Sequence, residues 1–228
     1  YGSTQRDFAA VASKNSFHGS LNPKAQYREQ QSIDEVLNSR AISYPLTLGM
    51  CSPIGDGAAA AIIVNEAVAK RLGLARAVKV RTSLLRSGWD YADNEPGVAE
   101  VVCREAYEAA GLGPQDLDVV ELHDASSPAE LIYYETLGLC EKGEGARFVN
   151  EGHSKLGGKT PVNPSGGLLR KGHPVGATGL AQVHELVEQL RGEAGPRQVE
   201  GARIGMAENG GGYIGRDAAA IVISILEK

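Results

Sequence analysis

The sequence predicts an α/β fold, because short apolar stretches typical of strands alternate along the chain with longer stretches of helical periodicity. Two further observations support a globular domain of this class. The 228 residues are 42% hydrophobic and 22% charged, which is enough apolar material for a substantial core. Many of the 29 glycines gather near residues 157–179 and 205–215, where we expect close backbone approaches.

Six helices are expected, each from its apolar spacing and from residues that start or stop a helix. Glu35 stands three residues after Ser32, which is the spacing of a capping box, and Asn65 is a typical helix cap. Gly111 and Gly192 end two of the longer helices. The six helices are expected over residues 7–15, 32–39, 65–72, 98–110, 127–136 and 177–191.

Five strands are expected between these helices. The run 58–64 lacks polar alternation and ends in β-branched residues, which is typical of a strand buried on both faces, although so short a run could also begin a helix. The other runs are short and apolar, and one of them carries His123 and Asp124 into a loop. The five strands are expected over residues 58–64, 77–81, 119–123, 203–207 and 218–225.

Composition excludes several classes of function. Lys and Arg total 23 against 28 Asp and Glu, which gives a net charge of −5, so no nucleic-acid partner is expected. No apolar stretch approaches the roughly 20 residues that span a bilayer, so no membrane partner is expected. Three cysteines at spacings unlike a zinc site or a disulfide framework indicate a reducing, cytoplasmic compartment and no bound metal. The chain opens at Tyr1 without a signal-peptide pattern and is expected to be a fragment.

Polar residues near the ends of expected strands and helices are the candidates for chemistry. His173 lies just before the helix expected over 177–191, so a negatively charged oxygen beside it would feel the field of the helix N-terminus. An imidazole there can donate a hydrogen bond to a carbonyl oxygen or act as the base that activates a thiol. The run Gly210, Gly211 and Gly212 leaves backbone N–H groups uncovered, which is one way to build an oxyanion hole.

Each candidate also has a plain structural explanation. A histidine in a loop is commonly a hydrogen-bonded surface residue, and three glycines can form a close packing turn. Residues 209–215 lack the GxGxxG spacing, so a dinucleotide site is not supported. The cysteines are expected to be small buried hydrophobes. No role is assigned to His18, His153 or His184.

The joint pattern of these motifs resembles the thiolase superfamily. After His123-Asp124 come Asn163-Pro164-Ser165-Gly166-Gly167, then Gly172-His173-Pro174, then the late glycine run, and together these blocks are far more specific than any one of them. Upstream, Ala12-Ser13-Lys14-Asn15, Asn22-Pro23 and Asp56-Gly57-Ala58 fit the same group. The narrower likeness is to the thiolase domain of sterol carrier protein X and to bacterial lipid-transfer thiolase-like proteins.

The resemblance implies a thiolase-like fold of layered αβαβα type. By that likeness residues 1–48 are the end of a loop domain that covers the acyl-CoA, 49–76 are the last strand and helix of the first half, and 77–228 are the complete second half. The nucleophilic cysteine of the family lies in the first half, upstream of this chain, and Cys51 does not match it.

The resemblance also implies roles for individual residues. His173 matches the histidine that activates the nucleophile and helps to bind the thioester oxygen, and His123 matches the residue that holds a water at an oxyanion site. Asn163 and Gly210 to Gly212 are expected to bind the oxyanion or the substrate. Ala125 and Glu208 stand where the two types of family member carry their acid/base cysteine.

Proton transfer therefore has to come from another group. The candidates are Glu208 and Tyr213, and for Glu208 the alternative is that it points into solvent at the end of a strand.

The implied function is an enzyme of lipid or sterol acyl-CoA metabolism that acts on the C–C bond beside a CoA thioester, by acyl transfer or thiolysis of a 3-oxoacyl-CoA. One alternative is retro-aldol cleavage of a β-hydroxyacyl-CoA such as a steroid side chain. Another is a non-catalytic acyl-CoA- or lipid-binding scaffold subunit. Coenzyme A is the expected cosubstrate, with no covalently bound cofactor, and the expected partners are a second copy of the chain and a small OB-fold protein.

Overall fold

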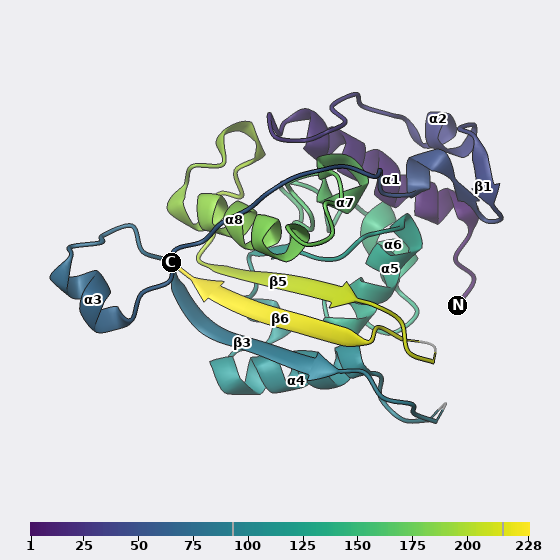
Figure 1. Cartoon of the computed structure of the whole chain (residues 1–228). Coiled ribbons are helices and arrows are strands. Elements are labelled where there is room, and N and C mark those ends of the chain that lie inside the picture. Colours follow the sequence, from purple (N-terminus) through teal and green to yellow (C-terminus); the bar gives the residue numbers. More distant parts are fainter. Residues whose placement is uncertain (93, 216) are drawn as a thin grey trace.

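A mixed four-stranded sheet forms the centre of the molecule (Figure 1). The structure is a computed structural model and describes residues 1–92, 94–215 and 217–228. The strand order is β3 (Lys79–Ser87), β6 (Ala220–Glu227), β5 (Ile204–Gly211) and β4 (Val119–Glu121). Strand β6 is antiparallel to both of its neighbours, whereas β4 is parallel to β5. The carboxyl ends of β4 and β5 therefore lie at the same edge of the sheet.

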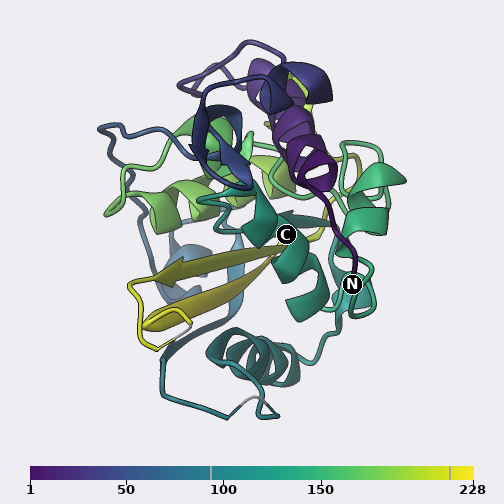
Figure 2. The same cartoon turned by 90° about the vertical axis from the view of Figure 1, so that its right-hand side faces the viewer.

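Helices cover both faces of this sheet, as Figure 2 shows for α4 (Val98–Ala110) and α8 (Thr178–Arg191). Side chains alternate between the faces along β5. Met206 packs into the larger core with α4 and α5 (Ser127–Thr136), while Ala207 packs into a smaller core with α8. The α/β fold class expected from the sequence is confirmed.

The N-terminal segment lies over the end of the molecule that carries α5. Helix α1 (Gln5–Ser20) packs against α5, α6 (Gly145–Asn150) and α7 (Gly167–Lys171). Helix α2 (Ile33–Leu37) and the hairpin of β1 (Ala41–Ser43) and β2 (Leu46–Thr47) pack beside it. Short 3-10 turns lie over Leu48–Met50, Pro114–Asp116 and Gly195–Arg197.

Local signals for helix ends are confirmed closely. The capping box of Ser32 and Glu35 starts α2, and the side chain of Asn65 accepts a hydrogen bond from the Val68 N–H at the start of α3 (Glu66–Arg71). Gly111 and Gly192 have φ values of 68° and 74° at the ends of α4 and α8. Helices α6 and α7 were not expected, because they are short and begin in glycine-rich sequence.

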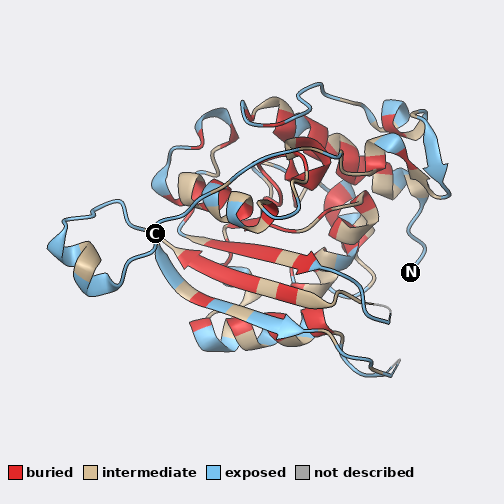
Figure 3. Cartoon of the chain, viewed as in Figure 1, coloured by how far each residue is buried: buried red, intermediate tan, exposed pale blue. Residues whose placement is uncertain are grey.

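The prediction of a strand over residues 58–64 is wrong. The segment is extended but pairs with no strand among the described residues, and it is exposed in Figure 3. Ile62 and Ile63 are 96% and 83% exposed. A strand forms only where a neighbour satisfies its backbone, and the described part of the chain offers no such neighbour here. Across the described ranges, none of the helices has the length and hydropathy needed to cross a membrane.

Candidate functional site

The two histidines singled out by the sequence lie side by side at one edge of the sheet. His123 follows β4, and His173 follows α7 and Gly172. Their ring centroids are 4.9 Å apart and the rings meet edge to face at 82°. Burial lowers the pKa of His123 to about 4, and the neighbouring His173 contributes to the shift. The pKa of His173 is also lowered, by burial and then by the charge of Lys171. Both imidazoles are therefore neutral at neutral pH.

A hydrogen bond orients the ring of His173. Its Nδ1 lies 2.8 Å from the hydroxyl of Thr178, the first residue of α8. That hydroxyl gives its own hydrogen to the Pro174 carbonyl at 3.2 Å, so it accepts from Nδ1–H. The Nε2 atom is then left without a proton, and His173 can act as a base through it.

A cavity of about 640 Å³ adjoins His173. Gly172, Pro174 and Thr178, which neighbour or bond His173, lie in its wall, and the rest comes from the segments 22–26 and 55–60 and from α8. Its walls carry the cationic side chains of Lys24 and Lys171. Asp56 and Glu185 also line it, so the cavity has charges of both signs in its wall and reaches the two residues that flank His173.

Glu208 does not point into solvent, so that alternative is wrong. It is fully buried, and its Oε2 accepts the His123 backbone N–H at 2.9 Å. Like Met206, it faces the side of the sheet that α4 and α5 cover. Burial raises the pKa of Glu208 to about 7, although the His123 N–H and the hydroxyl of Tyr133 oppose the rise. Glu208 thus lies directly behind the backbone of His123 and titrates near neutrality.

Only part of the late glycine run is a loop. Gly210 and Gly211 belong to β5 and pair with Ile221 and Ala220, whereas Gly212, with φ 68°, starts the turn. The Glu208 carbonyl accepts a hydrogen bond from the side chain of Gln182 at 2.9 Å, so it points away from β6. Backbone groups two residues apart in a strand point the same way. The N–H of Gly210 therefore points to the side of β5 on which β4 lies, beyond the last β4 pairing at Ala207.

Gly210 also makes room for a neighbouring side chain. A Cβ atom at this position would lie 3.2 Å from the Tyr133 hydroxyl and 3.4 Å from Glu208 Oε1. Tyr213, the other candidate for proton transfer, lies beyond the strand and is 75% exposed. The structure therefore brings His123, His173, Glu208 and Gly210 to one edge of the sheet, and it leaves Tyr213 on the surface of the hairpin.

Asn163 does not have a side chain free for a substrate. It is fully buried, and its Oδ1 accepts from Leu122 N–H at 2.9 Å while its Nδ2 donates to Glu130 at 2.9 Å. Its backbone carbonyl lies 3.0 Å from Nδ1 of the buried His18. The expectation that Asn163 binds the substrate is therefore corrected: its polar groups are used to join β4, α5 and α1.

The cysteines and Ala125 supply no acid/base group. Burial raises the pKa of Cys51, and it raises those of Cys103 and Cys140 to about 12. The methyl side chain of Ala125 has no exchangeable proton. Among the residues that the structure describes, no group of three or more His, Cys, Asp or Glu is arranged to hold a metal ion.

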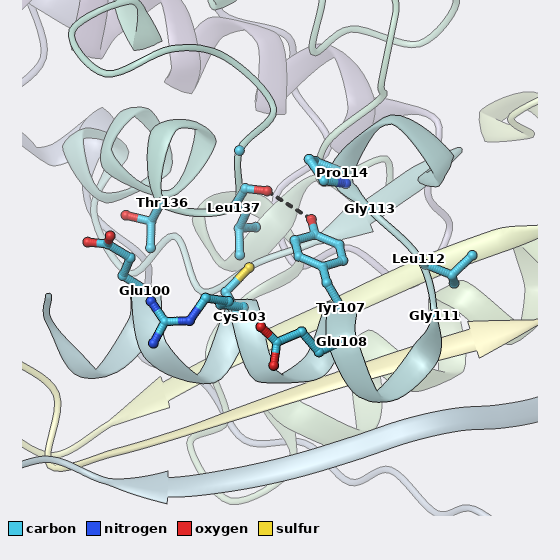
Figure 4. A pocket seen from close by; sticks show the side chains of 12 residues that line it. Glu100, Cys103, Tyr107, Glu108, Gly111, Leu112, Gly113, Pro114, Thr136 and Leu137 are labelled. Carbon is cyan, nitrogen blue, oxygen red and sulfur yellow. Dashed lines mark hydrogen bonds between the residues drawn. The ribbon is translucent and has the colours of Figure 1, made fainter.

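A second cavity lies on the other side of the sheet, between α4 and the residues that follow α5 (Figure 4). Its volume is about 430 Å³, and Cys103 and Tyr107 line it, with the Tyr107 hydroxyl donating to the Leu137 carbonyl at 2.8 Å. None of the residues that the sequence singled out for catalysis lines this cavity. The cavity of about 640 Å³, whose wall includes both neighbours of His173, is therefore the one associated with the histidine pair.

Comparison with known proteins identifies the family of this chain. Residues 90–224, more than half of the chain, match the family described as "Thiolase C-terminal domain-like". The chain therefore belongs to the thiolase family.

Three relatives show how far the similarity extends. Sterol carrier protein 2 of Oryctolagus cuniculus is 44% identical over 231 residues, which cover 97% of this chain and 42% of the relative. The benzoylsuccinyl-CoA thiolase subunit BbsB of Thauera aromatica is 43% identical over 92% of this chain and 56% of its own. An acetyl-CoA acetyltransferase of Methanothermobacter thermautotrophicus is 43% identical over 97% of this chain and 59% of its own.

A solved structure, that of the "Ltp2-ChsH2(DUF35) aldolase", matches all of this chain and 59% of its own with a TM-score of 0.80 at 24% identity. At that identity the match supports the fold. The chain spans between about two fifths and three fifths of the length of these proteins.

The sequence missed one group of residues behind the histidines. Lys14, Asn15, Asp124 and Glu130 are buried together with Asn163. Lys14, Asn15 and Asp124 belong to motifs of the family resemblance, but those motifs do not reveal which residues will surround them.

Proposed function

We propose that the protein to which this chain belongs acts on the C–C bond beside a CoA thioester, by acyl transfer or thiolysis of a 3-oxoacyl-CoA. The observation that carries the proposal is the pair of neutral imidazoles, 4.9 Å apart, beside a cavity of about 640 Å³. The names of two relatives, an acetyl-CoA acetyltransferase and a benzoylsuccinyl-CoA thiolase subunit, support a CoA thioester as the substrate and CoA as the cosubstrate.

In this proposal the two histidines have different roles. The free Nε2 of His173 accepts the proton of a thiol whose sulfur attacks the 3-oxo carbon of the acyl-CoA. The C2–C3 bond then breaks, the acyl group stays on the attacking sulfur, and the CoA thioester leaves as an enolate that takes up a proton at C2. His123 holds a water or a second carbonyl oxygen, and the N–H of Gly210 adds a donor for the oxyanion. Lys24 and Lys171 on the cavity wall suit the phosphate groups of CoA.

The C–C step also needs a proton donor and acceptor. Glu208 is our candidate, because its pKa of about 7 lets it exist in both protonation states at neutral pH. Its position behind His123, beside the Tyr133 hydroxyl and Gly210, requires the proton to pass through Tyr133 or a water. Tyr213 is the second candidate, and its exposure leaves it free to reach a ligand only if the hairpin lies against one.

Retro-aldol cleavage of a β-hydroxyacyl-CoA is the second candidate function. Ala125 and Glu208 in place of the two acid/base cysteines favour it, since that reaction needs a base and an enolate hole but no thiol relay. Both substrate classes should therefore be offered to the protein. Formation of two thioesters would support thiolysis, whereas release of a ketone or aldehyde would support the aldolase.

Assembly with other chains is also part of the proposal. One relative is named as a subunit, and the name of the solved neighbour joins two proteins, one of them of the DUF35 type. A homodimer in the cytoplasm, with a small OB-fold partner, is the arrangement we propose. Light scattering of the complete protein at micromolar concentration measures it, and a species of one-protomer mass would contradict it.

The substitution His173→Ala tests the site directly. In the complete protein we expect turnover of the acyl-CoA to fall about 100- to 10,000-fold, the usual effect of losing a general base or an oxyanion donor. Calorimetric affinity for the same thioester should change much less. His153→Ala is the matched control, because His153 is partly exposed and bonded to Glu151.

Two results would contradict the proposed function. Tight acyl-CoA binding by the wild-type protein without turnover of either substrate class would leave only the third possibility, a non-catalytic binding or scaffold subunit. Full activity of the His173→Ala variant would remove His173 from the mechanism.

A further inference from the structure

Five polar side chains form a cluster, here named the polar hub, beneath the loop that carries His123. Its members are Lys14 and Asn15 of α1, Asp124, Glu130 of α5, and Asn163. Lys14 is 2% exposed and the other four are fully buried. Charged side chains are rarely buried to this extent unless each is paired, so the contacts within the hub need an explanation.

Glu130 is the centre of the polar hub. Its Oε1 forms an ion pair with Lys14 and accepts the hydroxyl of Tyr134, and its Oε2 accepts Nδ2 of Asn15 at 2.8 Å and Nδ2 of Asn163 at 2.9 Å. Lys14 donates a further hydrogen bond to the Val162 carbonyl at 2.9 Å. Every donor around Glu130 therefore comes from α1, from α5 or from the chain at 162–163.

One side of the polar hub holds the end of β4. Asn163 donates its backbone N–H to the Val120 carbonyl at 2.8 Å, and its Oδ1 accepts from the Leu122 N–H at 2.9 Å. Leu122 immediately precedes His123. The position of His123 is therefore set by an asparagine whose own orientation depends on Glu130.

The other side of the hub holds the start of α7. Asp124 accepts the Leu168 N–H at 2.7 Å through Oδ1 and Nδ2 of Asn15 at 2.8 Å through Oδ2. Its carboxyl group occupies the place that a Cβ would take at Gly167, so α7 and Asp124 are in close contact. Helix α7 ends at Lys171, two residues before His173. The hub thus bonds to the segments that carry both histidines.

Stability alone does not explain this arrangement. A buried ion pair must offset its own desolvation and is often no more stabilising than apolar residues of the same volume. Apolar residues, however, cannot supply directional hydrogen bonds that fix two loops relative to each other. We propose that the polar hub holds His123 and His173 in contact, and that Asn15 and Glu130, through the hydrogen bonds between them and to Asn163, are positioning residues of the catalytic site. The catalytic part of this inference rests on the proposed function.

Two double variants separate the hub's hydrogen bonds from its charge. Lys14→Met with Glu130→Gln removes both charges but keeps an acceptor for Asn15 and Asn163. Lys14→Met with Glu130→Leu removes the charges and the acceptor together. In the complete protein we expect the first to keep kcat within about threefold of wild type and the second to lose about 100-fold in kcat with little change in KM.

A readout without turnover accompanies the kinetics. The pKa of His123, about 4 in the structure because of burial and the adjacent His173, is measured by NMR titration of labelled histidine. It should stay low in the Gln variant and rise toward the ordinary value of 6.5 in the Leu variant, as the rings separate and become hydrated. Leu190→Ala, a core change in the smaller cluster on α8, is the control for lowered stability and should leave both readouts unchanged.

The results for these variants test the positioning role of the hub independently of the proposed function. A folded Leu variant with wild-type kcat and a His123 pKa of about 4 would overturn the inference. If the Leu variant does not fold, Asn15→Leu, which removes only the two bonds from Asn15, takes its place under the same criteria. If the wild-type protein turns over neither substrate class, the proposed function fails, while the His123 titration still tests whether the hub holds the two rings together.

Discussion

The polar hub and the extended segment 52–65 reverse the usual relation between residue type and burial. Lys14 is 2% exposed, whereas Ile62, in a run of alanines and isoleucines, is 96% exposed. The difference follows from the partners that each side chain finds. Lys14 meets a carboxylate and a backbone carbonyl, while the apolar run meets no strand among the described residues. Hydropathy describes what a residue gains from burial, and the neighbours decide whether burial happens.

The largest loss of stability is expected when only one partner of the Lys14–Glu130 ion pair is removed. Lys14→Met alone leaves Glu130 buried without its cation, and we expect it to lower the free energy of unfolding by about 3–5 kcal/mol. Urea unfolding of the variant and of wild type measures the difference. Adding Glu130→Gln should restore most of the loss, and an equally unstable double variant would show that Lys14 contributes through packing rather than through its charge.

A smaller, pH-dependent effect is expected at Glu208, which is buried like Glu130 but forms no ion pair with the described residues. Its pKa in the folded protein is raised from 4.5 to about 7, so the stability that it contributes is present at low pH and is lost as the pH rises through about 7. Glu208→Gln keeps an acceptor for the His123 N–H but cannot ionise. We expect the variant to be more stable than wild type by about 1–3 kcal/mol near pH 8 and equal to it near pH 4.

Thermal unfolding of Glu208→Gln and wild type across this pH range checks whether the stability difference grows with rising pH. A stability difference that does not vary with pH would mean that Glu208 titrates at its ordinary pKa. Turnover of the same variant separates the chemical role, since an amide cannot transfer the proton that we assign to the carboxyl group.

The smallest effect is expected in the exposed segment. Ile62→Ser should change the free energy of unfolding of the 228-residue chain by less than about 0.5 kcal/mol, because the side chain has almost no contacts to lose. Denaturant unfolding measures this, with Ile223→Ser in the buried strand β6 as a control that should be strongly destabilising. A cost above about 1 kcal/mol for Ile62→Ser would show that the segment packs against something in solution.

Elements governed by neighbouring residues were predictable from the sequence. The capping box of Ser32, the cap at Asn65 and the glycine ends of α4 and α8 all lie where the local pattern placed them, because a helix end is satisfied by residues within one turn of it. The two histidines also lie where their motifs predicted, beside a strand end and a helix start, and their catalytic roles stay a prediction.

The burial and contacts of side chains that meet residues distant in the sequence are set only by the tertiary structure. The burial of Lys14 requires Glu130, which lies 116 positions away in the sequence, and the role of Asn163 depends on β4 and α5. The motif predicted a role for Glu208 but left the direction of its side chain open, and that direction follows from the backbone of His123, 85 positions away. Hydrogen bonds and ion pairs act over a few ångströms, and the sequence does not show which distant groups the fold will bring within that distance.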